Sequence, residues 1–113
     1  MTKIDDKTRL RHMLDAAREA SLFIQGKTRE SLNTERMLAL SLVRLLEIIG
    51  EAASRVSQEK QAQVPEIPWR QIIGMRNRLT HAYFDISLDF VWQTVTEDLV
   101  PLMTELERIL SEE

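Results

Sequence analysis

The chain has 113 residues, no cysteine and a formal net charge of −3 at pH 7, so it suits one domain, residues 1–113, with a core of its own. The composition excludes a disulfide framework and thiolate chemistry, and the mild negative charge excludes a protein that coats nucleic acid by bulk electrostatics. No apolar run approaches the roughly 18 residues of a membrane span, and we therefore expect a cytoplasmic protein that does not contact a membrane.

The first half of the chain has the apolar spacing of two helices. A first helix is expected over residues 5–25, ended by Gly26. A second is expected to begin with Ser31 or Asn33 as its N-cap and to run to about Ser57. Its apolar face is wider than one seam, which predicts a central helix that contacts its neighbours and a second subunit. The main stripe is formed by Leu38, Leu42, Leu45, Ile49, Ala52 and Val56. Gly50 in the middle of this helix costs about 1 kcal/mol relative to Ala, which predicts a close helix approach there.

A proline-bounded junction separates this half from a third helix. Residues 58–67 are mostly polar, and Pro65 and Pro68 interrupt any helix there, so this stretch is predicted to be a loop. The third helix is expected to begin at Pro68 and to reach Tyr83. One stripe of this helix would carry Ile72, Arg76, Leu79 and Tyr83. Arg76 thus falls where a core residue would be expected.

The last segment has helical spacing to the end of the chain. Asp85 and Ser87 are alternative N-caps, and Asp89 would complement the dipole in the first turn. Pro101 cannot donate a hydrogen bond to Glu97, so a kink is expected there. Four helices without a strand pattern predict an all-α fold, an antiparallel up-and-down bundle of four main helices with a kinked last helix.

Three polar groups within six residues form the candidate site. Arg76 must reach solvent or meet an anion, because a guanidinium is costly to bury alone. Asn77 and His81 are an i, i+4 pair on a neighbouring face, whereas Arg76 and His81 would lie about 140° apart on an ideal helix. A permanent cation, an amide and an imidazole that titrates near neutrality can together handle a phosphate.

Two carboxylates of the second helix are candidate supporting residues. Glu47 and Glu51 share a face with Arg44 and Arg55, which predicts ion pairs within the helix. Alternatively, Glu47 or Glu51 holds the arginine or the histidine of the site. The other histidine, His12, lies among charged neighbours and is expected at the surface.

The candidate residues also carry a family resemblance. Arg76, His81 and Tyr83 resemble the R-x-x-x-x-H-x-Y signature of the HEPN superfamily (higher eukaryotes and prokaryotes nucleotide-binding domain), and specifically its HepT-like toxins. The flanking segments that match in order are residues 46–52, 67–70, 83–84 and 88–92. Ala82 departs from the pattern, because relatives often have Gly after the histidine.

This resemblance implies a metal-independent endoribonuclease that acts as the toxin of a type II/VII-like toxin–antitoxin pair. His81 would be the base for the ribose 2′-OH or the acid for the leaving oxygen, since its unperturbed pKa is about 6.5. Arg76 would hold the phosphate and stabilise the developing charge, and Asn77 would orient the phosphate or the imidazole. No cofactor is implied, and no metal-ligand spacing stands out.

The resemblance also implies two protein partners. One is a second copy of the chain, in a homodimer whose two Arg-His pairs face one cleft. The other is a minimal nucleotidyltransferase antitoxin that attaches AMP to the hydroxyl of Tyr83. The added anionic group beside Arg76 would then switch off the nuclease.

Two other functions compete with the nuclease. The protein could bind nucleotides without cleaving them, as a partner subunit that recruits substrate for a nucleotidyltransferase. It could also be a structural bundle in which Arg76 pairs with Glu47 or Glu51 and His81 is a hydrogen-bonded interior residue. Composition and periodicity alone favour the structural bundle, whereas the motif and its flanks favour the nuclease.

Overall fold

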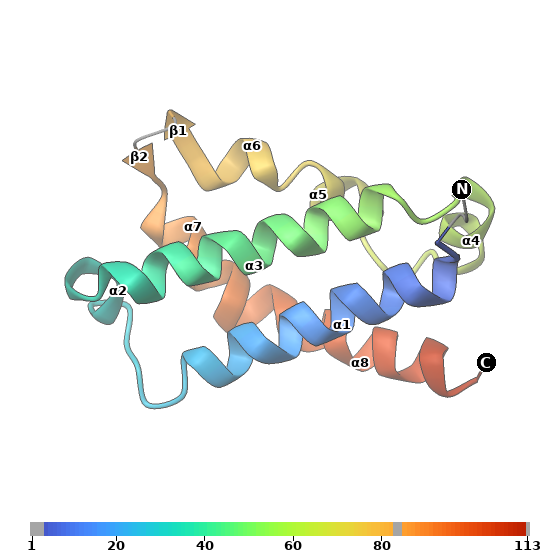
Figure 1. Ribbon diagram of the computed structural model, residues 1–113, viewed down its shortest axis with the longest axis horizontal. Helices are drawn as coiled ribbons and strands as arrows, with labels where there is room; N and C mark the ends of the chain where they lie inside the picture. Colours follow the sequence, from blue (N-terminus) through green and yellow to red (C-terminus); the bar gives the residue numbers. More distant parts are fainter. Residues whose placement is uncertain (1–3, 83–84, 113) are drawn as a thin grey trace.

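The computed structural model, which describes residues 4–82 and 85–112, is all-α apart from one very short hairpin, as predicted (Figure 1). Its longest helices are α1 (Asp6–Phe23) and α3 (Arg36–Ser54). The C-terminal helical segment is continuous and comprises α7 (Leu88–Gln93), the π-helical turn η1 (Thr94–Asp98) and α8 (Leu99–Ser111). No helix within the described ranges is both long and apolar enough to span a bilayer.

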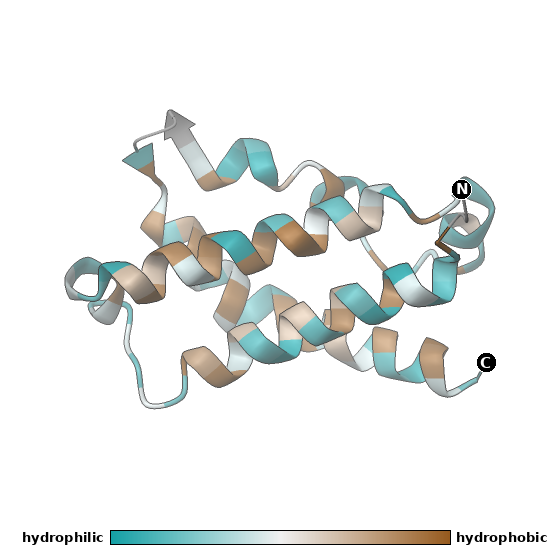
Figure 2. Cartoon of the chain, in the orientation of Figure 1, coloured by the Kyte–Doolittle hydropathy of each residue, from teal (hydrophilic) through white to brown (hydrophobic). Residues whose placement is uncertain are grey.

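Helix α1 is antiparallel to both α3 and α8. Its first residue, Asp6, accepts hydrogen bonds from the amide (2.9 Å) and hydroxyl (2.6 Å) of Ser57, just beyond the end of α3. At the other end of α1, Arg18 pairs with Glu107 of α8 at 3.0 Å. The brown residues of the long helices in Figure 2 mark the apolar stripes that this arrangement brings together. The fully buried core includes Leu10, Met13, Leu42, Leu46, Ile49 and Leu106.

Helix α1 lies within the predicted range and ends three residues before Gly26. The carboxylate of Asp5 accepts the amide of Thr8 at 2.8 Å and caps the helix. These hydrogen bonds lower the pKa of Asp5 below its usual range. At the other end, Gly26 has φ +72°, the left-handed conformation that favours glycine after a helix.

The second predicted helix is wrong at its start, and it ends at Ser54, three residues before the expected end. Residues Ser31–Thr34 form a separate turn, α2, and Glu35 leaves the helical region with φ −112° and ψ 85°. Neither predicted N-cap acts as one: Asn33 bonds to side chains of the preceding turn, and the hydroxyl of Ser31 accepts the amide of Thr28 at 3.0 Å. The single helix of the sequence pattern is therefore broken before Arg36.

The predicted loop over residues 58–67 contains a helix, α4 (Gln58–Gln63). Ser57, expected at the end of the second helix, instead caps α4, and its hydroxyl accepts the amide of Lys60 at 3.1 Å. Asp6 fixes Ser57 in that role through the two hydrogen bonds described above. The polar composition of α4 concealed it, since it buries none of its residues.

The third predicted helix is the largest error. It is divided into α5 (Trp69–Ile73) and the single turn α6 (Arg76–Leu79), and the chain then extends as β1 (Thr80–Ala82), which pairs with β2 (Asp85–Ile86). Gly74 and Met75 interrupt the helical register between α5 and α6. As a result Met75, which is 5% exposed, enters the core in place of Arg76.

The last helical segment is irregular just before Pro101, the residue at which a kink was expected. The amide of Leu99 donates to the carbonyl of Thr94, five residues back, which makes η1 a π-helical turn. Neither expected residue caps this segment through its side chain. Asp85 lies in β2, and Ser87 occupies the cap position of α7 without a side-chain hydrogen bond within the described residues.

Candidate functional site

A small pocket of about 240 Å³ lies between α3 and the α5–α6 segment. Four of the residues predicted for the site line it: Glu47 and Glu51 from α3, and Arg76 and Asn77 from α6. The remaining lining residues are Leu46, Gly50, Ser54 and Ile73. The fold thus brings two carboxylates, a guanidinium and an amide from separate helices to one place.

Gly50 allows the close approach of α3 and α5 beside this pocket. A Cβ atom built on Gly50 would lie 3.1 Å from the carbonyl oxygen of Ile72, which is tighter than ordinary contact. The close helix approach that the sequence predicts at Gly50 is therefore present, because any side chain would push the backbone of α5 away.

Arg76 faces solvent at the rim of the pocket. Its side chain is 67% exposed, so the sequence-based expectation that it would occupy a core position is wrong. Its ion pair within the described residues is with Glu51, where Nη2 lies 3.6 Å from Oε2. That distance exceeds a hydrogen bond, so Arg76 has free donors to offer an anion.

Glu51 joins Arg76 to the surface of α3. Its other oxygen, Oε1, lies 3.0 Å from Nη2 of Arg55, one turn further along the helix. Glu47 pairs with Arg44 at 3.9 Å. Both arrangements considered for these carboxylates therefore occur together: ion pairs within α3, and a contact from Glu51 to the candidate arginine.

The second motif residue, His81, follows α6 directly. Its backbone lies in β1, so the predicted i, i+4 relation to Asn77 on one helix is wrong. The hairpin that carries it is anchored by the amide of Ser87, which donates to the carbonyl of Leu79 at 2.7 Å. Tyr83, the residue expected to be modified, lies outside the described residues.

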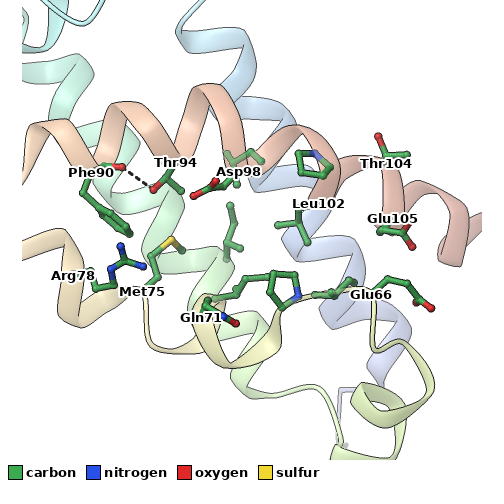
Figure 3. Close-up of a pocket in the computed structure, with 16 residues that line it drawn as sticks. Glu66, Gln71, Met75, Arg78, Phe90, Thr94, Asp98, Leu102, Thr104 and Glu105 are labelled. Atoms are coloured by element: carbon green, nitrogen blue, oxygen red, sulfur yellow. Dashed lines mark hydrogen bonds between the residues drawn. The ribbon is translucent and has the colours of Figure 1, made fainter.

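Arg78 points away from the pocket. Arg76 and Arg78 are two residues apart and therefore lie on opposite sides of α6. The guanidinium carbon of Arg78 lies 4.4 Å from the ring centroid of Phe90 on α7 (Figure 3). Residue spacing in the sequence does not predict this contact, because it forms only when α6 packs on α7.

Within residues 4–82 and 85–112, no group of three His, Asp or Glu side chains is placed to hold a metal ion. The site is thus defined by a solvent-facing arginine, an amide and two carboxylates, beside a strand that carries a histidine.

The fold and site define a small helical protein in which the arginine of an Arg-x-x-x-x-His motif lines a charged pocket. The family model for HepT-like ribonucleases, described as "Ribonuclease HepT-like", matches residues 13–109. The chain belongs to this family and is a ribonuclease of the HEPN type.

Alignments with two relatives extend over most of the chain. A "Probable ribonuclease HepT" of Thermococcus cleftensis is 35% identical over 100 residues, which are 85% of this chain and 91% of the relative. A protein of Methanocaldococcus jannaschii named "Putative RNase MJ1380" is 32% identical over 107 residues, 95% of this chain and 98% of the relative. No solved structure matches the chain.

Proposed function

We propose that the protein is a metal-independent endoribonuclease toxin that acts on RNA in the cytoplasm, with Arg76 and His81 as its catalytic residues. The observation that carries this proposal is the exposed guanidinium of Arg76, which has free donors at the rim of a pocket. Membership of the HepT-like ribonucleases supports the reaction class.

The proposed reaction needs a proton acceptor, a proton donor and a phosphate ligand. One imidazole removes the proton of the ribose 2′-OH, and the 2′-oxygen attacks the adjacent phosphorus. The 5′-oxygen leaves with a proton from an acid, which gives a 2′,3′-cyclic phosphate and a 5′-hydroxyl. Arg76 stabilises the extra negative charge of the five-coordinate transition state, and Asn77 orients the phosphate or the imidazole of His81.

Two subunits would supply both imidazoles. One chain contributes a single motif histidine, His81, whereas the reaction uses a base and an acid. The exposed face of α3 supports a homodimer, because Met37 is 85% and Leu40 43% exposed. Since Arg44, Glu47 and Glu51 continue this face at helical spacing, a partner packed there would lie beside the pocket.

Control by a cognate antitoxin is the second part of the proposal. A minimal nucleotidyltransferase would transfer AMP from ATP to the hydroxyl of Tyr83 and release pyrophosphate. The new phosphodiester carries a negative charge, which would compete with RNA for Arg76. The alternative is a non-catalytic subunit that binds nucleotides or recruits substrate for such a transferase, in which Arg76 is a phosphate ligand without a reaction to assist.

The nuclease proposal is tested by cleavage of single-stranded RNA in excess EDTA by the purified protein and four variants. His81→Ala should lower the rate by about 10²- to 10⁴-fold, and Arg76→Ala by about 10²- to 10³-fold. The matched controls are His12→Ala and Arg70→Ala, which change exposed residues outside the pocket and should leave the rate unchanged.

Unaltered cleavage in folded His81→Ala would refute the catalytic role. Loss of nucleotide binding in Arg76→Ala, with no RNA cleavage by the wild type, would favour the non-catalytic alternative. The antitoxin proposal has its own readout, the intact mass after co-expression with a candidate nucleotidyltransferase. An adenylyl mass increment that is lost in Tyr83→Phe would support it, and no increment with an active transferase would refute it.

A further inference from the structure

A second and larger cavity, of about 650 Å³, lies on the other side of the α5–α6 segment from Arg76 (Figure 3). One wall comes from residues 66–78 and the other from residues 90–105, with Ile49 of α3 also in the lining. The catalytic proposal uses none of this groove. Its volume falls in the range of about 300–1,000 Å³ that is typical of small-molecule sites.

The walls of the groove are mainly apolar. Ile72 and Met75 face Leu99 and Leu102 across it, and these side chains give a ligand apolar surface to cover. The π-helical turn η1 forms part of one wall, and such turns recur at functional sites. The last residue of that turn, Asp98, lines the cavity.

The two threonine hydroxyls in the walls already donate hydrogen bonds to the backbone. The hydroxyl of Thr94 donates to the carbonyl of Phe90 at 2.7 Å, and that of Thr104 donates to the carbonyl of Val100 at 3.2 Å. The guanidinium of Arg78 covers the ring of Phe90. Neither threonine hydroxyl is therefore free to donate to a ligand.

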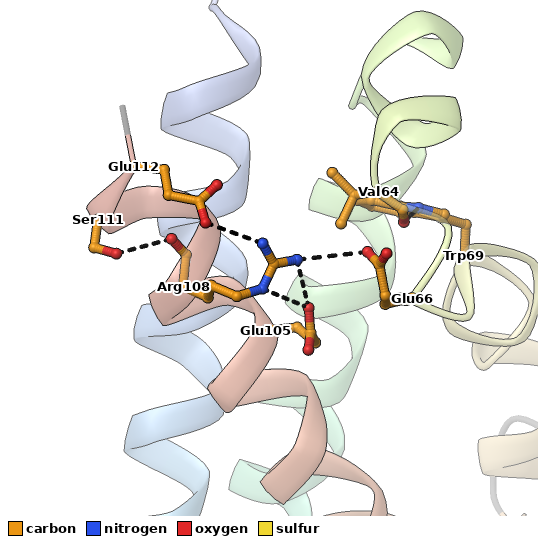
Figure 4. Close-up of polar contacts among 7 residues, drawn as sticks. All are labelled: Val64, Glu66, Trp69, Glu105, Arg108, Ser111 and Glu112. Atoms are coloured by element: carbon orange, nitrogen blue, oxygen red, sulfur yellow. Dashed lines mark hydrogen bonds and ion pairs between the residues drawn. The ribbon is translucent and has the colours of Figure 1, made fainter.

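The charged side chains in and beside the groove are mostly carboxylates. At its far end, the single cation Arg108 of α8 pairs with three carboxylates, Glu66 at 3.5 Å, Glu105 at 2.8 Å and Glu112 at 3.1 Å, so this cluster keeps a net negative charge (Figure 4). The contacts with Glu105 and Glu112 raise the pKa of Arg108 further above its usual range. The carboxylate of Asp98 makes no hydrogen bond or ion pair with any residue in 4–82 or 85–112. The lining thus carries three carboxylates, Glu66, Asp98 and Glu105, and one cation, Arg78, so its net charge is negative.

We propose that this groove is a binding site for a small ligand that has an apolar body and a protonated amine. The apolar body lies against Ile72, Met75 and Leu102, and the ammonium group donates to the carboxylate of Asp98. A phosphate or carboxylate ligand is disfavoured, because Glu66, Asp98 and Glu105 outnumber Arg78 in the lining. The site is thus distinct in chemistry from the phosphate site at Arg76.

The test uses 4-phenylbutylamine as the probe and 4-phenylbutyrate as its oppositely charged analogue. Each is titrated into the full-length ¹⁵N-labelled protein at pH 7 and constant ionic strength, and amide chemical shifts are followed. The amine should give saturable shifts at Met75, Asp98 and Leu102, and the carboxylate should bind more weakly. Shifts at Glu51 and Arg76 should be smaller, because these residues line the other pocket.

Two matched variants isolate the role of the carboxylate. Asp98→Asn should weaken binding of the amine by about two- to fivefold, the range of a solvent-exposed ion pair. Glu97→Gln removes the same charge from the neighbouring position, which does not line the groove, and should leave the affinity unchanged.

Three results would overturn the proposal: shifts that do not saturate, equal binding of the amine and the carboxylate, or equal effects of Asp98→Asn and Glu97→Gln. None of these outcomes depends on RNA cleavage, so the groove and the nuclease site succeed or fail separately.

Discussion

Replacing Glu51 with glutamine tests what the ion pair with Arg76 does. In the free protein, Glu51 lies 3.6 Å from Arg76 and 3.0 Å from Arg55. A carboxylate at this place competes with an RNA phosphate for Arg76 and repels it, whereas an amide of the same shape carries no charge. We therefore expect Glu51→Gln to bind RNA more tightly than the wild type.

The size of the effect follows from the exposure of the pair. Arg76 is 67% and Glu51 49% exposed, and ion pairs in such surroundings contribute about 0.2–1 kcal/mol. Relief from this competition corresponds to about 1.4- to 5-fold tighter binding. The free energy of unfolding should fall by no more than about 2 kcal/mol, since two such pairs are lost.

Fluorescence anisotropy of a labelled single-stranded RNA measures the affinity, in a His81→Ala background that prevents cleavage. Glu47→Gln is the control, because it removes an equal charge from the same pocket but its ion pair is with Arg44. A gain confined to Glu51→Gln supports competition at Arg76. Weaker binding in that variant would refute the reasoning and show that Glu51 holds Arg76 in its binding orientation.

Three further predictions concern stability. Ser57→Ala should lower the free energy of unfolding by about 1–3 kcal/mol, because it removes both the cap of α4 and the hydrogen bond that the hydroxyl donates to Asp6. Denaturant titration against the control Ser54→Ala would measure this loss. A double-mutant cycle of Arg78→Met and Phe90→Leu should give a coupling of about 0.5–1 kcal/mol in the same titration, and zero coupling would refute the cation–π contact. The pKa of Asp5 is lowered in the folded state. Its carboxylate should therefore contribute fully to the free energy of unfolding above the unfolded pKa, near 3.8, and this contribution should be lost as the pH falls through the folded pKa. Asp5→Asn keeps a cap without this titration, and an unchanged acid unfolding profile in that variant would contradict the assignment.

The sequence by itself determined the elements whose apolar stripe is long. The first helix and most of the second could be placed because their many core residues repeat at helical spacing over several turns. The close approach at Gly50 also followed from the sequence. A glycine in a helix interior costs stability, so its presence indicates that a side chain there would block a neighbouring element. Glu51 was identified as a partner for the site because it shares a face with other charged residues of one long helix.

The tertiary structure alone decided how the second half of the chain folds. Helices as short as α5 and α6 are not stable by themselves, so their register depends on what they pack against. Burying Met75 and Leu79 stabilises the fold more than an uninterrupted helix would. The resulting register turns Arg76 outward to Glu51 and places Arg78 against Phe90. Periodicity assumes one unbroken helix, and it therefore placed Arg76 in the core and could not predict the two cavities on either side of α5–α6.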